Sequence, residues 1–111
     1  AAAGPGGGAA TANLHTLTCY ETQDVTGGDQ VYLQINGQTV WSSADSLDCD
    51  HNAPTTVPVN RLAKTGDTVS LYDEDSPDAD DHLGSDVVEG DRGTLTFNLD
   101  DALYTLDYGP A

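Results

Sequence analysis

Residues 31–43, VYLQINGQTVWSS, indicate the fold class because they carry the pattern of a β-hairpin. Val31, Leu33 and Ile35 alternate with more polar positions, and this period of two is typical of a half-buried strand. Asn36 and Gly37 separate this run from a second candidate strand, and an Asn-Gly pair favours the tight turns of two-residue hairpins. The stretch therefore predicts two antiparallel strands joined by a short turn.

The same alternation recurs along the chain from residue 13 onward. Further candidate strands are residues 13–20, 55–59, 68–74, 85–89, 94–100 and 102–108, and Gly, Asp and Asn separate them. Pro58 lies inside one of these runs, which implies an edge strand or a bulge. No stretch has helical periodicity. Seven or eight short strands predict one all-β domain, an antiparallel β-sandwich, over residues 13–111.

Residues 1–12, AAAGPGGGAATA, form a tail of small residues that offers nothing to bury. We expect a flexible extension that docks into a groove of a partner protein, because small side chains suit a segment that adds to a sheet or enters a narrow channel. The positions expected to touch the partner are Ala1, Ala2, Ala3, Gly4, Pro5, Gly6, Gly7, Gly8, Ala9 and Ala10.

The charge of the chain restricts its partners. The formal net charge is −16, and Arg61, Lys64 and Arg92 are the only strong bases. Such a chain repels phosphate backbones and anionic headgroups, so we expect no nucleic-acid binding and favour cations and basic protein surfaces. The acids comprise 16 Asp and 3 Glu. Asp suits turns and metal-binding loops, although adaptation to high salt is an alternative explanation.

Cys19 and Cys49 are the only cysteines. An even number in a small acidic domain favours a disulfide and an oxidising compartment, with two buried thiols as the alternative. The start at Ala1 fits a processed or trimmed chain. We therefore expect a secreted, extracellular protein, and we expect the disulfide to brace the end of the sandwich that carries the acidic loops, or its neighbour.

Residues 71–84, LYDEDSPDADDHLG, hold the densest group of acids in the chain. They leave one candidate strand and return to another, so they predict an inter-strand loop. Crowded carboxylates repel one another, and a divalent cation relieves that repulsion. Calcium accepts six to eight oxygens in flexible geometry, whereas zinc prefers His or Cys ligands. His82 is expected to be a bystander, and a solvated acidic rim without metal remains the alternative.

The spacing Asp73-x-Asp75, five residues and then Asp81, followed by Gly84, resembles the third calcium loop of C2 domains. Upstream, Asp24 and Asp29 precede a strand, as in the first C2 loop, although the spacing is one residue shorter and Val31 replaces the usual Pro. The resemblance covers about residues 14–107. It implies a C2-like calcium site whose ligands are Asp24, Asp29, Asp73, Asp75 and Asp81.

The sequence does not favour membrane docking or catalysis. The loop tips TGG and SPDA carry no aromatic, aliphatic or basic residue, so membrane docking is not expected. No serine lies in a nucleophile motif and the three histidines are scattered, so we expect no enzyme, with an unrecognised hydrolase as the alternative. Trp41 and the tyrosines are expected mainly in strand-face packing, with a sugar- or protein-binding surface as the second possibility.

These features together predict a secreted, calcium-stabilised β-sandwich that serves as a protein-binding adaptor. A calcium-dependent lipid- or carbohydrate-binding module is the alternative. The size, the strand content and the N-terminal extension also resemble the small secreted adaptor subunits of bacterial umbrella toxin particles. That resemblance implies a role in a toxin complex.

Overall fold

The structure is a computed structural model that describes residues 11–23, 28–74 and 78–111. Eight strands follow one another in the chain. They are β1 (Thr11–Glu21), β2 (Val31–Ile35), β3 (Gln38–Ser42), β4 (Thr55–Lys64), β5 (Thr68–Asp73), β6 (Asp81–Val87), β7 (Gly93–Phe97) and β8 (Leu103–Pro110). Among the described residues, no helix is long and apolar enough to cross a membrane.

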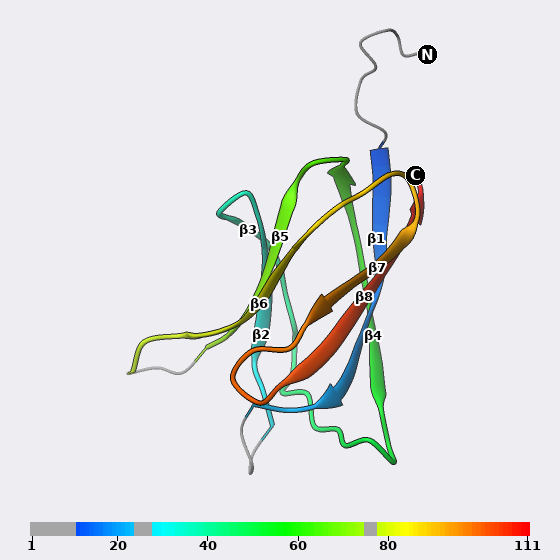
Figure 1. Cartoon of the computed structure of the whole chain (residues 1–111). Helices are drawn as coiled ribbons and strands as arrows, with labels where there is room; N and C mark the ends of the chain where they lie inside the picture. Colours follow the sequence, from blue (N-terminus) through cyan, green and yellow to red (C-terminus); the bar gives the residue numbers. More distant parts are fainter. Residues whose placement is uncertain (1–10, 24–27, 75–77) are drawn as a thin grey trace, which may run out of the picture.

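The strands form two antiparallel four-stranded sheets, in the orders β4-β1-β8-β7 and β3-β2-β5-β6 (Figure 1). Each sheet turns apolar side chains toward the other because successive residues of a strand point to opposite faces. The fully buried side chains between the sheets include Leu14, Leu17, Val31, Leu33, Val69, Leu71, Leu83, Leu95, Phe97, Tyr104 and Leu106. The prediction of an all-β sandwich is confirmed.

The hairpin predicted at Asn36–Gly37 joins β2 to β3. Asn36 and Gly37 have φ angles of 51° and 85°, and positive φ at both positions is what a tight hairpin turn of this hand requires. Pro58 lies in β4, at the edge of its sheet, and faces Thr16 of β1 next to a register shift. Both the edge position and the irregularity agree with the sequence prediction.

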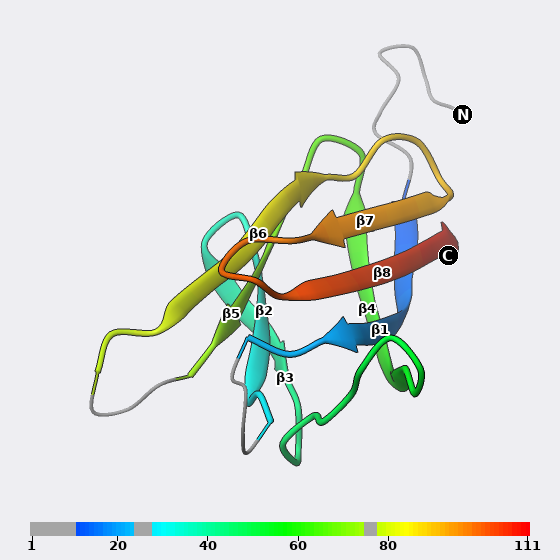
Figure 2. The ribbon, with the colours of Figure 1, turned by 60° about the horizontal axis from the view of Figure 1, so that its bottom comes forward.

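The two long sides of the sandwich differ. Figure 2 shows β6 and β7, the edge strands of opposite sheets, running close together. Gly84 of β6, with φ of 147°, makes this approach possible, because a Cβ there would lie 2.7 Å from Cα of Phe97. On the other side, Nε of Arg61 in β4 donates a 2.9 Å hydrogen bond to the carbonyl oxygen of Val40 in β3.

Several strand boundaries differ from the sequence prediction: β4 continues to Lys64 rather than ending at residue 59, and β7 ends at Phe97 rather than at residue 100. β1 begins at Thr11 rather than at residue 13, and Ala12 is fully buried. β6 begins at Asp81 rather than at residue 85. The alternation of Asp81 to Gly84 is obscured because a register shift places both Leu83 and Gly84 in buried positions. His82 therefore lies on a strand and not in a loop.

Candidate functional site

Four connections meet at one end of the sandwich, because the strands alternate in direction. We call this the acidic end and define it by the described residues 22–23, 28–30, 43–54, 74, 78–80 and 98–102, which belong to the connections of β1 to β2, β3 to β4, β5 to β6, and β7 to β8 (Figure 1). Acids in these connections, in the described part of the chain, are Asp29, Asp45, Asp48, Asp50, Glu74, Asp78, Asp80, Asp100 and Asp101.

Three of the five predicted calcium ligands lie on neighbouring segments beside the acidic end. In the register of β5 and β6, Asp73 is paired with Asp81. Asp73 is also paired with Val31 of β2, and its Oδ1 accepts a 2.9 Å hydrogen bond from the backbone N–H of Gln30. Asp29 precedes Gln30 directly. The pairing of β2 with β5 thus brings the bases of the two acidic loops side by side.

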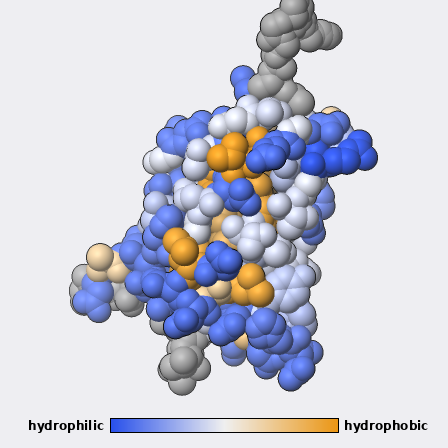
Figure 3. Space-filling view, in the orientation of Figure 1, coloured by the Kyte–Doolittle hydropathy of each residue, from blue (hydrophilic) through white to orange (hydrophobic). Residues whose placement is uncertain are grey.

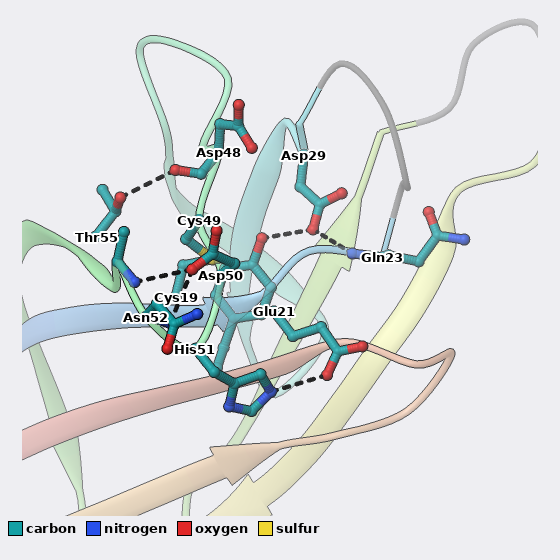
Figure 4. Close-up of a disulfide and its surroundings, with 12 residues drawn as sticks. Cys19, Glu21, Gln23, Asp29, Asp48, Cys49, Asp50, His51, Asn52 and Thr55 are labelled. Atoms are coloured by element: carbon teal, nitrogen blue, oxygen red, sulfur yellow. Dashed lines mark hydrogen bonds and ion pairs between the residues drawn. A yellow bond between two sulfur atoms is a disulfide. The ribbon is translucent and has the colours of Figure 1, made fainter.

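Asp29 is fully buried and accepts two hydrogen bonds on the same oxygen. Oδ2 receives 2.7 Å and 2.5 Å bonds from the backbone N–H of Gln23 and the hydroxyl of Tyr104. The first of these is drawn in Figure 4. The backbone of Asp29 also exchanges hydrogen bonds of 2.8 and 2.7 Å with Leu47. Asp29 therefore links Gln23, Tyr104 and Leu47, and metal binding by this residue would compete with these contacts.

Asp73 and Asp81 face each other across β5 and β6 but differ in exposure. Asp73 is 1% exposed, while Asp81 is half-buried at the start of β6. The other two predicted ligands, Asp24 and Asp75, lie outside the described residues. Within the described ranges, no group of three or more His, Cys, Asp or Glu side chains is placed to hold a metal ion. The complete ligand set therefore stays a prediction.

The disulfide between Cys19 and Cys49 is present and supports the acidic end. It links β1 to the connection between β3 and β4 (Figure 4). Around it, Oδ1 of Asp50 accepts bonds of 2.8 and 2.9 Å from the backbone N–H groups of Asn52 and Ala53. Nε2 of His51 lies 3.1 Å from a carboxylate oxygen of Glu21. The connection is thus tied to β1 at the end where the sequence placed the brace.

An aromatic cluster on the outer face of the second sheet was missed by the sequence analysis. The rings of Tyr32 and Tyr72 stack with centroids 5.3 Å apart and an interplanar angle of 13°. His82 follows at 5.0 Å from Tyr72. The period of two could have placed Tyr32 and Tyr72 on outward faces, but their contact depends on the pairing of β2 with β5. Tyr32 also donates its hydroxyl hydrogen to Oδ2 of Asp80.

The environment of Tyr32 changes its acidity. Burial raises the pKa of Tyr32 to about 12, and the hydrogen bond and negative charge of Asp80 act in the same direction. Burial disfavours the phenolate by removing water. Asp80 disfavours it by repulsion and by accepting a hydrogen bond from the neutral hydroxyl. Tyr32 therefore stays a neutral hydrogen-bond donor throughout the physiological range.

A groove of about 490 Å³ runs beside this ring, over β2 and β3. Its lining is largely polar and comprises Gln30, Val31, Tyr32, Gln34, Thr39, Ser42, Ser43 and Glu74. A second, smaller hollow of about 280 Å³ lies where β3 and β4 face each other and is lined by Trp41, Leu47, Val57 and Pro58 among others. Half-buried Trp41 thus packs at the edge of the core, as the sequence analysis expected for most aromatic residues.

His82 makes a polar contact that resembles part of a catalytic site. Its Nε2 lies 2.8 Å from Oγ of Ser85, which lies 2.7 Å from Oγ of Ser70. All three residues occupy the outer face of β5 and β6, and His82 and Ser85 are exposed. Catalysis by such a pair requires a positioned third group and a pocket that excludes water. The contact is described more simply as a polar row on a strand surface.

The surface charge is unevenly distributed along the sandwich. Lys64 ends β4 and Arg92 precedes β7, so both lie opposite the acidic end, and Arg61 lies in the same half of β4. Figure 3 shows a largely hydrophilic face with small hydrophobic areas. Among the described residues, the exposed large apolar ones are Leu62, Val87 and Leu99.

No protein-family model matches the chain, and the search of curated proteins found no match. Its function is therefore argued from this geometry.

Proposed function

We propose that this chain is a secreted, non-catalytic adaptor module whose acidic end is stabilised by calcium. The observation that supports the calcium site is the pairing of Asp73 with Asp81 next to Gln30, the residue that follows Asp29, at the base of two neighbouring loops. These loops also contain Asp24 and Asp75 in the sequence. Oxygen-rich loops at one end of a β-sandwich suit calcium, which tolerates irregular geometry and six to eight ligands.

Calcium binding here would be structural. Asp73 and Asp81 would supply carboxylate oxygens, and Asp24 and Asp75 would complete the set from the two loops. The ion would supply positive charge that offsets the repulsion between these carboxylates. Asp29 would hold the first loop in place through its bonds to Gln23 and Tyr104.

The adaptor role is supported by charge and by the sequence before β1. A net charge of −16 favours a partner with a basic surface. The expected partner-binding segment, residues 1–10, lies outside the described residues and directly precedes β1. The disulfide is compatible with an extracellular complex, including a bacterial toxin particle. Lipid docking receives no support from the acids around the loops.

The calcium proposal is tested by a thermal-shift experiment. The melting temperature should rise in millimolar calcium relative to a chelator, while magnesium and sodium chloride at equal ionic strength should produce a smaller rise. The double variant Asp75→Asn plus Asp81→Asn should lose the calcium-specific rise. Asp100→Asn plus Asp101→Asn is the matched control, since both positions are exposed at the acidic end and have positive φ, which Asn accepts. A wild type with no calcium-specific rise would disprove the site.

The adaptor proposal is tested separately by affinity capture from the culture medium of the source organism. The full chain should recover a partner, and the chain lacking residues 1–10 should recover much less of it. The partner is identified by mass spectrometry and the binding is repeated with the purified protein. Equal recovery by both chains would show that the tail is not the docking element.

A further inference from the structure

Three aromatic rings lie in a row on the outer face of the sheet β3-β2-β5-β6. His82 of β6, Tyr72 of β5 and Tyr32 of β2 form a row across three neighbouring strands. One face of the Tyr32 ring is covered by Tyr72. The groove lies on the other side of Tyr32, because its strand residues come from β2 and β3. The second face of this ring therefore borders the groove.

The position of Tyr32 is held before any ligand arrives. The ring is stacked on Tyr72, and the hydroxyl is hydrogen-bonded to Asp80. A ring that is already ordered loses little conformational entropy when a ligand packs on it. Tyr32 is thus a prepared flat surface with an apolar face and a polar tip.

The rest of the groove offers hydrogen-bonding groups. Gln34 and Thr39 face each other across β2 and β3 and share a 3.3 Å hydrogen bond, and Ser42 is paired with Tyr32 in the same register. Glu74 closes the groove at the acidic end, where its backbone N–H donates to the carbonyl oxygen of Gln30. Amide, hydroxyl and carboxylate groups together both donate and accept hydrogen bonds.

A flat aromatic surface beside hydrogen-bonding groups favours a ligand that has both an apolar face and a polar edge. A pyranose ring has one face of C–H groups that packs on an aromatic ring, and its edge carries hydroxyls that pair with amides and carboxylates. The groove volume of about 490 Å³ lies within the range of small-molecule sites. Glu74 and the net charge of −16 oppose nucleotides and acidic sugars. An apolar peptide would leave the polar lining without partners.

We propose that the groove over β2 and β3 binds a neutral oligosaccharide, with Tyr32 as the stacking surface and Gln34, Ser42 and Glu74 as hydrogen-bonding groups. None of these groove residues is a predicted calcium ligand or part of the expected tail contact, although Glu74 lies between Asp73 and Asp75 in the sequence. The groove adds glycan recognition to the proposed adaptor role, so that one module would contact both a protein and a sugar.

The experiment uses the full chain and is run both in calcium and in a chelator, because Glu74 of the groove lies between Asp73 and Asp75, two of the predicted calcium ligands. An array of defined neutral oligosaccharides, with uronate-containing and sulfated glycans beside them, is followed by NMR titration with each neutral sugar that binds. We expect binding to a neutral sugar, with the largest amide shifts at residues 32, 34, 39 and 42. Tyr32→Ala should weaken binding at least tenfold, and Gln34→Ala should weaken it severalfold.

Two controls keep the test decisive. Thr96→Ala changes an exposed residue of β7 on the other sheet and should leave the affinity unchanged. Gln34→Ala and Ser42→Ala test the groove even if Tyr32→Ala reduces folding, which far-UV circular dichroism detects. The proposal is overturned if no neutral oligosaccharide binds in calcium or in chelator, if only acidic glycans bind, or if the groove variants bind as tightly as wild type.

Discussion

At the residue scale, the hydroxyl of Tyr104 connects the two sheets at the acidic end. Tyr104 lies in β8 of the first sheet, and its hydroxyl donates to Oδ2 of Asp29, next to β2 of the second sheet. Both residues are fully buried. A buried carboxylate depends on such donors because it has lost its contact with water. One hydroxyl therefore supports both the packing of the sheets and the placement of the first acidic loop.

Tyr104→Phe removes this donor and keeps the ring. We expect a loss of about 1–3 kcal/mol in the free energy of unfolding, since a buried acceptor loses a partner. Urea denaturation measures the loss. Tyr20→Phe is the matched control, because Tyr20 is half-buried in β1 and its hydroxyl has no hydrogen-bond partner in the part of the chain that the structure describes. Similar midpoints for the two variants would contradict this role of Tyr104.

The raised pKa of Tyr32 leads to a prediction about alkaline pH. An unfolded tyrosine ionises near pH 10, whereas folding raises the pKa of Tyr32 to about 12. The native state thus holds this proton more tightly. The resulting stabilisation is complete below about pH 10 and is lost as the pH rises through about 12. Asp80→Asn should lower this pKa toward its usual value, because it removes the negative charge.

Absorbance of tyrosinate, recorded together with circular dichroism, follows this titration. Wild type should show a tyrosine that titrates near pH 12, and this signal should be missing in Tyr32→Phe and shifted to lower pH in Asp80→Asn. An identical titration in wild type and Asp80→Asn, with the fold intact, would be inconsistent with the proposed contact.

At the scale of the elements, the approach of β6 to β7 closes one side of the sandwich. The backbone N–H of Leu99 donates to the carbonyl oxygen of Leu83 at 2.9 Å, and that of Thr96 donates to Oδ2 of Asp86 at 3.1 Å. These bonds occupy groups that edge strands otherwise leave exposed. The small size of Gly84 permits the contact.

Gly84→Ala should therefore destabilise the protein more than Gly90→Ala. Both glycines have positive φ, so each variant carries backbone strain of about 1–3 kcal/mol. Only at Gly84 does the new Cβ also collide with the backbone of Phe97, whereas nothing lies within 4 Å of a Cβ at Gly90. Thermal and urea denaturation of both variants measure the difference. Equal losses in the two variants would mean that the approach of β6 to β7 does not depend on the small size of Gly84.

At the scale of the whole molecule, the disulfide contributes a large part of the free energy of unfolding. Cys19 and Cys49 are 30 residues apart in sequence. Closing a loop of this length stabilises a fold by about 3–4 kcal/mol in the chain-entropy description. Small domains have a total stability of about 5–15 kcal/mol, so this bond is a large part of it.

The double variant Cys19→Ala plus Cys49→Ala should lower the free energy of unfolding by about 3–4 kcal/mol. Reductant should lower the stability of wild type by a similar amount and leave the variant unchanged. Guanidinium denaturation with and without reductant gives both values. A variant as stable as the oxidised wild type would show that the bond is not needed for folding.

Local patterns made most of the fold predictable. A strand reveals itself by its own period of two, so all eight strands were located, as were the hairpin at Asn36–Gly37 and the edge position of Pro58. The pairing of Cys19 with Cys49 followed from there being only two cysteines. The start of β6 was misplaced because the register shift near Gly84 breaks the alternation on which the prediction relied.

The arrangement of the surface depended on contacts between distant strands. A resemblance to the calcium loops of C2 domains predicted one shared site for Asp24, Asp29, Asp73, Asp75 and Asp81. Only the fold showed that Asp29 is bonded to Tyr104, 75 residues away, and that Asp73 meets Asp81 and Gln30. The contact of Tyr32 with Tyr72 and the groove beside it likewise require β2 to pair with β5.

The sequence by itself thus determined which residues form strands, which side of each strand is apolar, and the negative charge of the whole. The tertiary structure decided which acids become buried acceptors, which stay at the surface, and which tyrosine borders a groove. The reason is physical: alternation is set by each strand's own backbone geometry. Strand order and register are set by packing between segments far apart in the chain.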